Sequence, residues 1–166
     1  ISLIKIALNK LELSNTFDVV HSAENEEFGK PHPAVFLTTA EKLNISNNVN
    51  FLGTCSRDKI REHMQKSKLL LLSSKSEAFP KVILESIATG TPIVVTNIGS
   101  CAQIANLTGG EVVPIEEPGK LHDALERLAS NPEKWEKSSN LSRKIALNYS
   151  WNNTSDKVIS VYKNLI

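Results

Sequence analysis

The sequence is poor in the residues that usually staple small domains or build metal sites. It has two cysteines, Cys55 and Cys101, without Cys-x-x-Cys spacing, and its four histidines form neither His-x-x-x-His nor His-Glu-x-x-His. The two cysteines could pair, but we predict two small buried thiols in a reducing compartment. The histidine spacing likewise predicts no metal site built by the protein.

An excess of one charge and a long apolar run are also missing. Nineteen Lys and Arg oppose eighteen Asp and Glu, which argues against a dedicated nucleic-acid binder. The longest apolar run, Leu69–Leu72, is too short for a membrane span. The start, Ile1–Lys5, lacks the order of a signal peptide, so we expect a cytoplasmic protein. It also lacks an initiating methionine, which predicts a piece of something larger.

Short apolar runs alternate with stretches of helical apolar periodicity along all 166 residues. This alternation predicts a single α/β domain over 1–166, a Rossmann-like three-layer domain with a mostly parallel sheet of about five strands. Ligands of such sheets bind at the carboxyl ends of the strands. Strands are expected at 17–20, 49–53, 68–73, 92–96 and 111–115, and helices at 3–13, 34–43, 57–67, 80–89, 121–129, 132–148 and 151–165.

Residues 73–85 are the most informative segment, because a buried strand leads through a polar loop into a helix. The first N–H groups of that helix have no partners, so Phe79–Val82 is expected to attract an anion. Glu77 precedes the helix and Glu85 lies inside it. Carboxylates beside a phosphate are suited to accept hydrogen bonds from the hydroxyls of a sugar and a ribose. Alternatively, Glu77 only complements the helix dipole and Glu85 is a solvated helix residue.

This segment resembles group 1 retaining glycosyltransferases of the GT-B fold, over about residues 48–166. The resemblance implies that Glu77 is catalytic and contacts the donor sugar, and that Glu85 contacts the ribose. It places Ala78, Phe79, Pro80 and Lys81 around the sugar and the pyrophosphate, with Lys81 at a phosphate, and it implies no metal or other cofactor. The matching elements are Val49–Gly53, Leu69–Ser74, Glu77–Pro80 with Glu85, Ala88–Thr96, Gly99, Gly110–Pro114, Tyr149–Trp151 and Tyr162.

The chain departs from that family in three ways. Gln103 stands where an acid is usual. The acceptor-binding domain is missing, and so are the first strand and loop of the donor domain, which bring an Arg and a Lys to the diphosphate. A sheet edge left exposed by the missing strand would favour self-association.

Residues 1–47 resemble a helix–strand–helix segment of a haloacid dehalogenase-like phosphatase, through Phe17–Glu24, Phe28–Pro33 and Ala40–Leu43. The resemblance implies a phosphate-stabilising role for Lys30; alternatively, Lys30 is a solvated loop lysine. That chemistry needs an Asp-x-Asp pair, which the chain lacks, so phosphatase activity is not expected.

The function predicted first is the nucleotide-sugar (donor) binding half of a retaining glycosyltransferase, without full hexosyl-transfer activity alone. Its partner is a nucleoside diphosphate-sugar. The alternative is an engineered or recombinant α/β chimera, joined near residue 47, with a structural role and no activity. A third hypothesis is a residual phosphate binder that uses Lys30.

Overall fold

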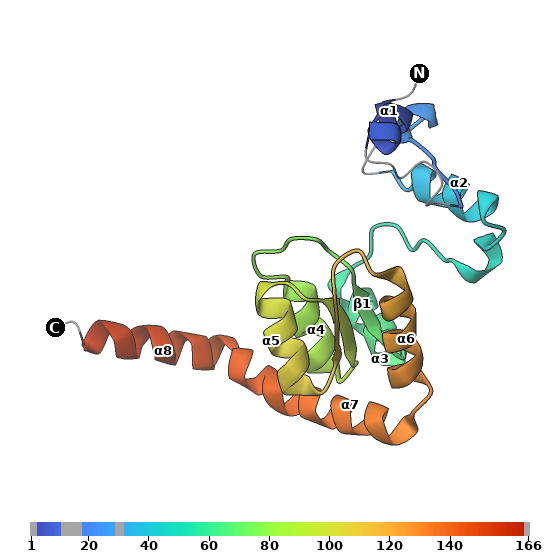
Figure 1. The fold of residues 1–166 in the computed structure, drawn as a ribbon. Coiled ribbons are helices and arrows are strands. Elements are labelled where there is room, and N and C mark those ends of the chain that lie inside the picture. The colour runs from blue at the N-terminus through green and yellow to red at the C-terminus, as the bar shows by residue number, and fades with distance from the viewer. Residues whose placement is uncertain (1–2, 11–17, 29–31, 165–166) are drawn as a thin grey trace. The chain divides into compact units, whose positions relative to one another are not determined.

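The computed structural model describes residues 3–10, 18–28 and 32–164 (Figure 1). The chain divides into two compact units, an N-terminal unit Ile1–Cys55 and a C-terminal unit Ser56–Ile166. The single-domain organisation over 1–166, with two segments that meet near residue 47, stays a prediction.

The N-terminal unit is made of short helices. Its best-packed part is α2, where Ala40 is buried and the Thr39 hydroxyl donates to the Val35 carbonyl oxygen at 2.6 Å. The rings of Phe36 and Phe51 stack with centroids 6.3 Å apart. The elements of this unit are α1 (Leu3–Lys10), η1 (Ala23–Asn25), α2 (Ala34–Lys42) and η2 (Ser46–Asn48).

The prediction of two strands in this unit is wrong for the residues that the structure describes. Asp18–Val20 and Val49–Gly53 form no strand, and Phe17 lies outside the described residues. Val20, Val49 and Leu52 are exposed. A short apolar run becomes a strand only when a neighbouring strand accepts its backbone hydrogen bonds, and within the described part of this unit none does.

The C-terminal unit contains a sheet of three parallel strands in the order β1-β2-β3, rather than the five expected. Leu71 lies opposite Val94, and Val95 lies opposite Val112. Its elements are α3 (Arg57–Lys66), β1 (Leu70–Leu72), α4 (Lys81–Thr89), β2 (Ile93–Thr96), α5 (Gly99–Thr108), β3 (Glu111–Val113), α6 (Pro118–Ala129), α7 (Pro132–Ala146), η3 (Leu147–Tyr149) and α8 (Trp151–Lys163).

The core lies on both faces of this sheet, which makes three layers as expected (Figure 1). Ile93 and Val95 on β2 pack against α4 and α5, whereas Val94 faces Ala124 and Leu128 of α6. Because successive side chains of a strand alternate between faces, the apolar run Ile93–Val95 of β2 fills both layers. Helix α7 then crosses the unit and contacts α4, α5 and α6.

Several helices of the C-terminal unit begin and end at residues that suit those positions. Ser56, Asn131 and Ser150 accept N-cap hydrogen bonds from the N–H groups of the third helical residue, at 3.0 to 3.3 Å. Gly90 ends α4 in the left-handed conformation, with φ of +80°. Within the described residues, no helix is both long and apolar enough to cross a membrane.

The sequence did not lead us to expect α5. Its buried positions, Cys101, Ile104, Ala105 and Thr108, have the spacing of one helix face, so the signal was present. It was weak because two of these side chains are small and Thr108 carries a hydroxyl. That hydroxyl is satisfied inside the helix, where it bonds to the Ile104 carbonyl oxygen at 2.9 Å.

Candidate functional site

The loop between β1 and α4 holds Glu77 in a defined position. The Thr96 hydroxyl donates to the Ser74 carbonyl oxygen at 2.5 Å, which attaches the loop to the end of β2. The Ser74 hydroxyl in turn donates to Glu77 Oε1 at 2.8 Å. Glu77 is exposed, so its second carboxylate oxygen is free to accept hydrogen bonds from a ligand hydroxyl.

Helix α4 begins beside this carboxylate without a side-chain cap. Pro80 is the N-cap residue, and the Ile83 N–H bonds to the Pro80 carbonyl oxygen at 3.2 Å. Among the described residues, the N–H groups of Lys81 and Val82 have no hydrogen-bond partner. These two donors, the helix dipole and the exposed Lys81 side chain together attract an anion. The loop and the helix start therefore form one continuous surface at the carboxyl end of β1.

The first turn of α5 lies near the same carboxylate. Burial raises the pKa of the Cys101 thiol, and the negative charge of Glu77 raises it further. Cys101 is 1% exposed, so it packs under the site rather than lining it. Cys55, the other expected buried thiol, is only half-buried, and both cysteines are free.

Phe79 is an aromatic residue of this loop that stays 47% exposed. The ring is tilted against that of Tyr149, with centroids 6.4 Å apart. Ala78 is also exposed, whereas Pro80 is buried and anchors the start of α4. The structure thus brings Glu77, Ala78, Phe79 and Lys81 to one surface.

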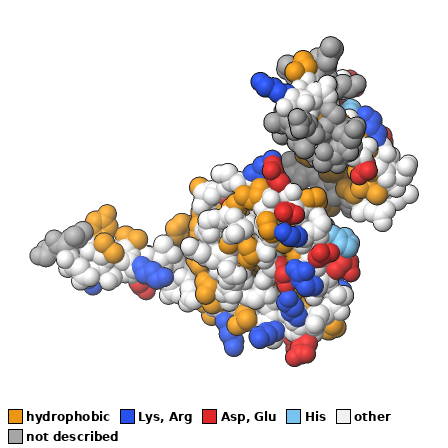
Figure 2. Space-filling view, in the orientation of Figure 1, with side chains coloured by type: hydrophobic (Ala, Val, Ile, Leu, Met, Phe, Trp, Pro, Cys, Tyr) orange, Lys and Arg blue, Asp and Glu red, His pale blue; other side chains and the backbone are white. Residues whose placement is uncertain are grey.

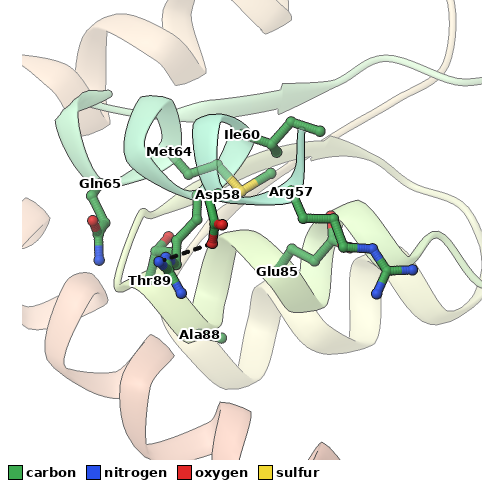
Figure 3. A pocket seen from close by; sticks show the side chains of 9 residues that line it. Arg57, Asp58, Ile60, Met64, Gln65, Glu85, Ala88 and Thr89 are labelled. Carbon is green, nitrogen blue, oxygen red and sulfur yellow. Dashed lines mark ion pairs between the residues drawn. The ribbon is translucent and has the colours of Figure 1, made fainter. Parts of the chain in front are cut away.

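Glu85 lies elsewhere on α4, in a cavity between α3 and α4 (Figure 3). The cavity has a volume of about 340 Å³, and Glu77 is not among its lining residues. Arg57, directly after the N-cap Ser56, also lines this cavity with its side chain. The sequence analysis did not predict a role for it. The lining residues are Arg57, Asp58, Ile60, Arg61, Met64, Gln65, Glu85, Ala88 and Thr89.

The remaining site predictions do not add to this surface. Lys30 lies outside the described residues. Within residues 3–10, 18–28 and 32–164, no cluster of three or more His, Cys, Asp or Glu could hold a metal ion. Figure 2 shows Lys and Arg side chains interspersed with Asp and Glu over the visible face of the C-terminal unit. Two exposed ion pairs lie on α3, Arg61–Asp58 and Lys66–Glu62.

The family model of group 1 glycosyl transferases matches residues 19–145. The chain belongs to this family. The match runs through residues 19–47 and across the expected junction near residue 47. The comparisons therefore give no support to a chimera or to a phosphatase-like origin of the first segment.

Curated relatives agree with the family. The D-inositol 3-phosphate glycosyltransferase of Corynebacterium urealyticum is 32% identical over 138 residues, which are 82% of this chain and 32% of that protein. The enzyme of the same name from Mycobacterium bovis is 29% identical over 142 residues, 83% of this chain and 29% of that protein. The chain spans about a third of the length of these relatives.

Two solved structures share the fold. Sucrose-phosphate synthase from Thermosynechococcus elongatus matches 78% of this chain and 33% of its own, with a TM-score of 0.72 and 19% identity. WaaG, a glycosyltransferase involved in lipopolysaccharide biosynthesis, matches 69% of this chain and 31% of its own, with a TM-score of 0.62 and 28% identity. The fold is therefore the Rossmann-like α/β fold of GT-B proteins, with three strands described here.

Proposed function

We propose that the chain is the nucleotide-sugar (donor) binding half of a retaining glycosyltransferase, and that it lacks full transferase activity alone. Group 1 glycosyltransferases use nucleotide-sugar donors, and the family match covers most of this chain. Transfer also requires an acceptor held against the donor sugar, because that positioning supplies much of the rate. The acceptor-binding part is expected in the portion of the relatives that this chain does not span.

The observation that carries the proposal is the surface around the start of α4. Glu77, fixed by Ser74, offers a carboxylate oxygen to sugar hydroxyls. The free N–H groups of Lys81 and Val82 offer donors to a diphosphate. Both groups lie at the carboxyl end of a parallel sheet, where such folds bind their ligands. Catalysis in the complete enzyme is assigned to the Glu77 region, and contact with the ribose to Glu85.

Glu85 and the neighbouring Arg57 give this proposal a specific geometry. Their cavity of about 340 Å³ opens between α3 and α4, beyond the first turn of α4 (Figure 3). A nucleoside diphosphate with its phosphates at Lys81 would extend its ribose along α4 toward Glu85. The Arg57 guanidinium would then lie near the nucleoside, where its five N–H donors can reach ring nitrogens or carbonyl oxygens of the base.

Calorimetric titration of the full chain with UDP, GDP and ADP tests the proposal. We expect one nucleotide to bind, and Glu85→Ala to weaken it about tenfold or more, because a hydrogen bond to a charged group is lost. Glu126→Ala, which removes an exposed glutamate on α6, is the matched control and should bind like the wild type. Equal binding by Glu85→Ala would remove Glu85 from the site. The absence of binding by any of the three nucleotides would overturn the proposed function.

A further inference from the structure

An ion pair joins the Glu77 loop to a distant part of the chain. Lys75, two residues before Glu77, bonds to Glu116, which lies between β3 and α6. The two residues are 41 positions apart. Because the strand order is β1-β2-β3, this contact spans the width of the described sheet at its carboxyl end.

The backbone at Glu116 is unusual. Its φ is +62°, in the left-handed region, which costs free energy for a residue with a Cβ atom. Only one other described residue that is not glycine, Asn44, has a positive φ, and asparagine tolerates this conformation far better than glutamate. Such conformations persist where the surroundings hold them, and they cluster at functional sites.

A cavity lies where this contact is made. It has a volume of about 180 Å³ and reaches the carboxyl ends of all three strands. Lys75 and Glu116 both line it, so the ion pair is formed across its rim. The lining residues are Ser73, Lys75, Thr96, Val113, Pro114, Ile115, Glu116, Glu117, Pro118 and Leu121.

We propose that Glu116 is a positioning residue for the donor site, and that it acts by holding Lys75 and thereby the loop that carries Glu77. This inference rests on the proposed function. The loop is then attached from two directions: Thr96 holds the Ser74 carbonyl from β2, and Glu116 holds Lys75 from the β3–α6 connection.

The pair by itself is an ordinary exposed one, with 73% of the Lys75 side chain and 68% of the Glu116 side chain accessible. Exposed pairs add little to global stability. Their effect is instead local, because the loop has few other attachments. Glu116 should therefore change nucleotide-sugar binding and loop protection while it leaves the melting temperature almost unchanged.

The test uses the full chain and three variants. In Glu116→Gln, we expect the Kd for a nucleotide-sugar to rise roughly two- to fivefold, with the difference lost at high ionic strength. The swap of Lys75→Glu with Glu116→Lys should restore affinity. Glu62→Gln is the matched control, since it removes the similarly exposed pair with Lys66 on α3 and should leave affinity unchanged.

Hydrogen exchange of the amides of residues 73–79 provides a readout that does not need a ligand. Faster exchange in Glu116→Gln, together with weaker binding and recovery in the swap, supports the proposal. Unchanged exchange in Glu116→Gln would overturn the proposal that Glu116 holds the loop. Faster exchange with unchanged affinity overturns the positioning role. If the wild type binds no nucleotide-sugar, the proposed function fails, whereas the exchange result alone decides whether Glu116 holds the loop.

Discussion

The hydroxyl of Ser74 and the carboxylate of Glu77 are joined by a hydrogen bond of 2.8 Å within the same exposed loop. Without this bond, Glu77 can rotate away from the start of α4. In Ser74→Ala, we expect affinity for a nucleotide-sugar to fall about two- to tenfold, while affinity for the free nucleoside diphosphate stays the same. Calorimetry with both ligands measures the difference. Ser76→Ala, in the same loop but without a described hydrogen bond, is the control; equal losses for both ligands would contradict the assignment of Glu77 to the sugar.

A side chain at Gly90 is expected to lower the stability of the C-terminal unit. Its φ is +80°, and a Cβ atom would lie 2.5 Å from the guanidinium of Arg143 on α7. Gly90→Ala should destabilise the C-terminal unit by about 1–3 kcal/mol, because left-handed backbone is costly for alanine and Arg143 must move. Gly119→Ala is the matched control, since nothing lies within 4 Å and α6 favours alanine. Thermal unfolding measures both; a Gly90→Ala variant as stable as the wild type would show that Arg143 is not packed there.

We expect the ion pairs of Glu111 to make the stability of the C-terminal unit fall in acid. Burial alone would raise the pKa of this carboxyl, but hydrogen bonds from Lys134 and Arg127 outweigh burial and lower it. The folded state therefore binds the proton more weakly than the unfolded state. The stabilisation is complete above the unfolded pKa of about 4.3 and is lost as the pH falls through the lower folded value.

Glu111→Gln should accordingly be less stable than the wild type at neutral pH, by about 1 kcal/mol. The difference should shrink between about pH 5 and pH 3, as the wild type becomes protonated. Urea unfolding at several pH values measures this. Glu136→Gln, an exposed glutamate without an ion pair among the described residues, should show no such convergence. A difference that stays constant with pH would contradict the role of the Glu111 charge.

Strand β1 predicts self-association. Within the described residues it pairs only with β2, and the Leu70 N–H bonds to the Pro92 carbonyl oxygen at 2.9 Å. In a parallel pair alternate residues face the neighbour, so the backbone groups of Leu71 point to the open edge. Its side chain is 42% exposed. Leu71→Lys should reduce concentration-dependent association in sedimentation velocity, whereas Leu107→Lys, on the surface of α5, should not. Equal association of both variants would exclude the open edge of β1 as the surface of self-association.

The sequence predicted the C-terminal unit better than the N-terminal one for a physical reason. Helix α4 has a local stop at Gly90, and β2 is apolar on both faces, so their patterns need no knowledge of partners. The expected strand at Val49–Gly53 is also a short, largely apolar run, but it has no strand beside it among the described residues of its unit. Strand formation depends on pairing, and pairing is not encoded in the run itself.

The candidate site divides in the same way. The Glu77 loop could be predicted because strand, loop and helix are contiguous in the sequence. The ion pair between Lys75 and Glu116 could not be predicted, because it joins residues 41 positions apart and the sequence does not indicate the left-handed backbone of Glu116. Arg57 was also missed, because it lines the same cavity as Glu85 only through the packing of α3 on α4.

Helix α8 has 13 residues, and none of those described is buried. Ser150 caps the N-terminus of α8, and the Thr154 hydroxyl donates to the Ser150 carbonyl oxygen at 2.9 Å. Both hydrogen bonds are local to the start of the helix. Isolated helices of this length are marginal in water. The ellipticity of α8 should therefore decline gradually on warming, ahead of the cooperative transition of the sheet. A calorimetric trace of the chain would then report the unfolding of the core, whereas circular dichroism at 222 nm would report the unfolding of the core and of α8.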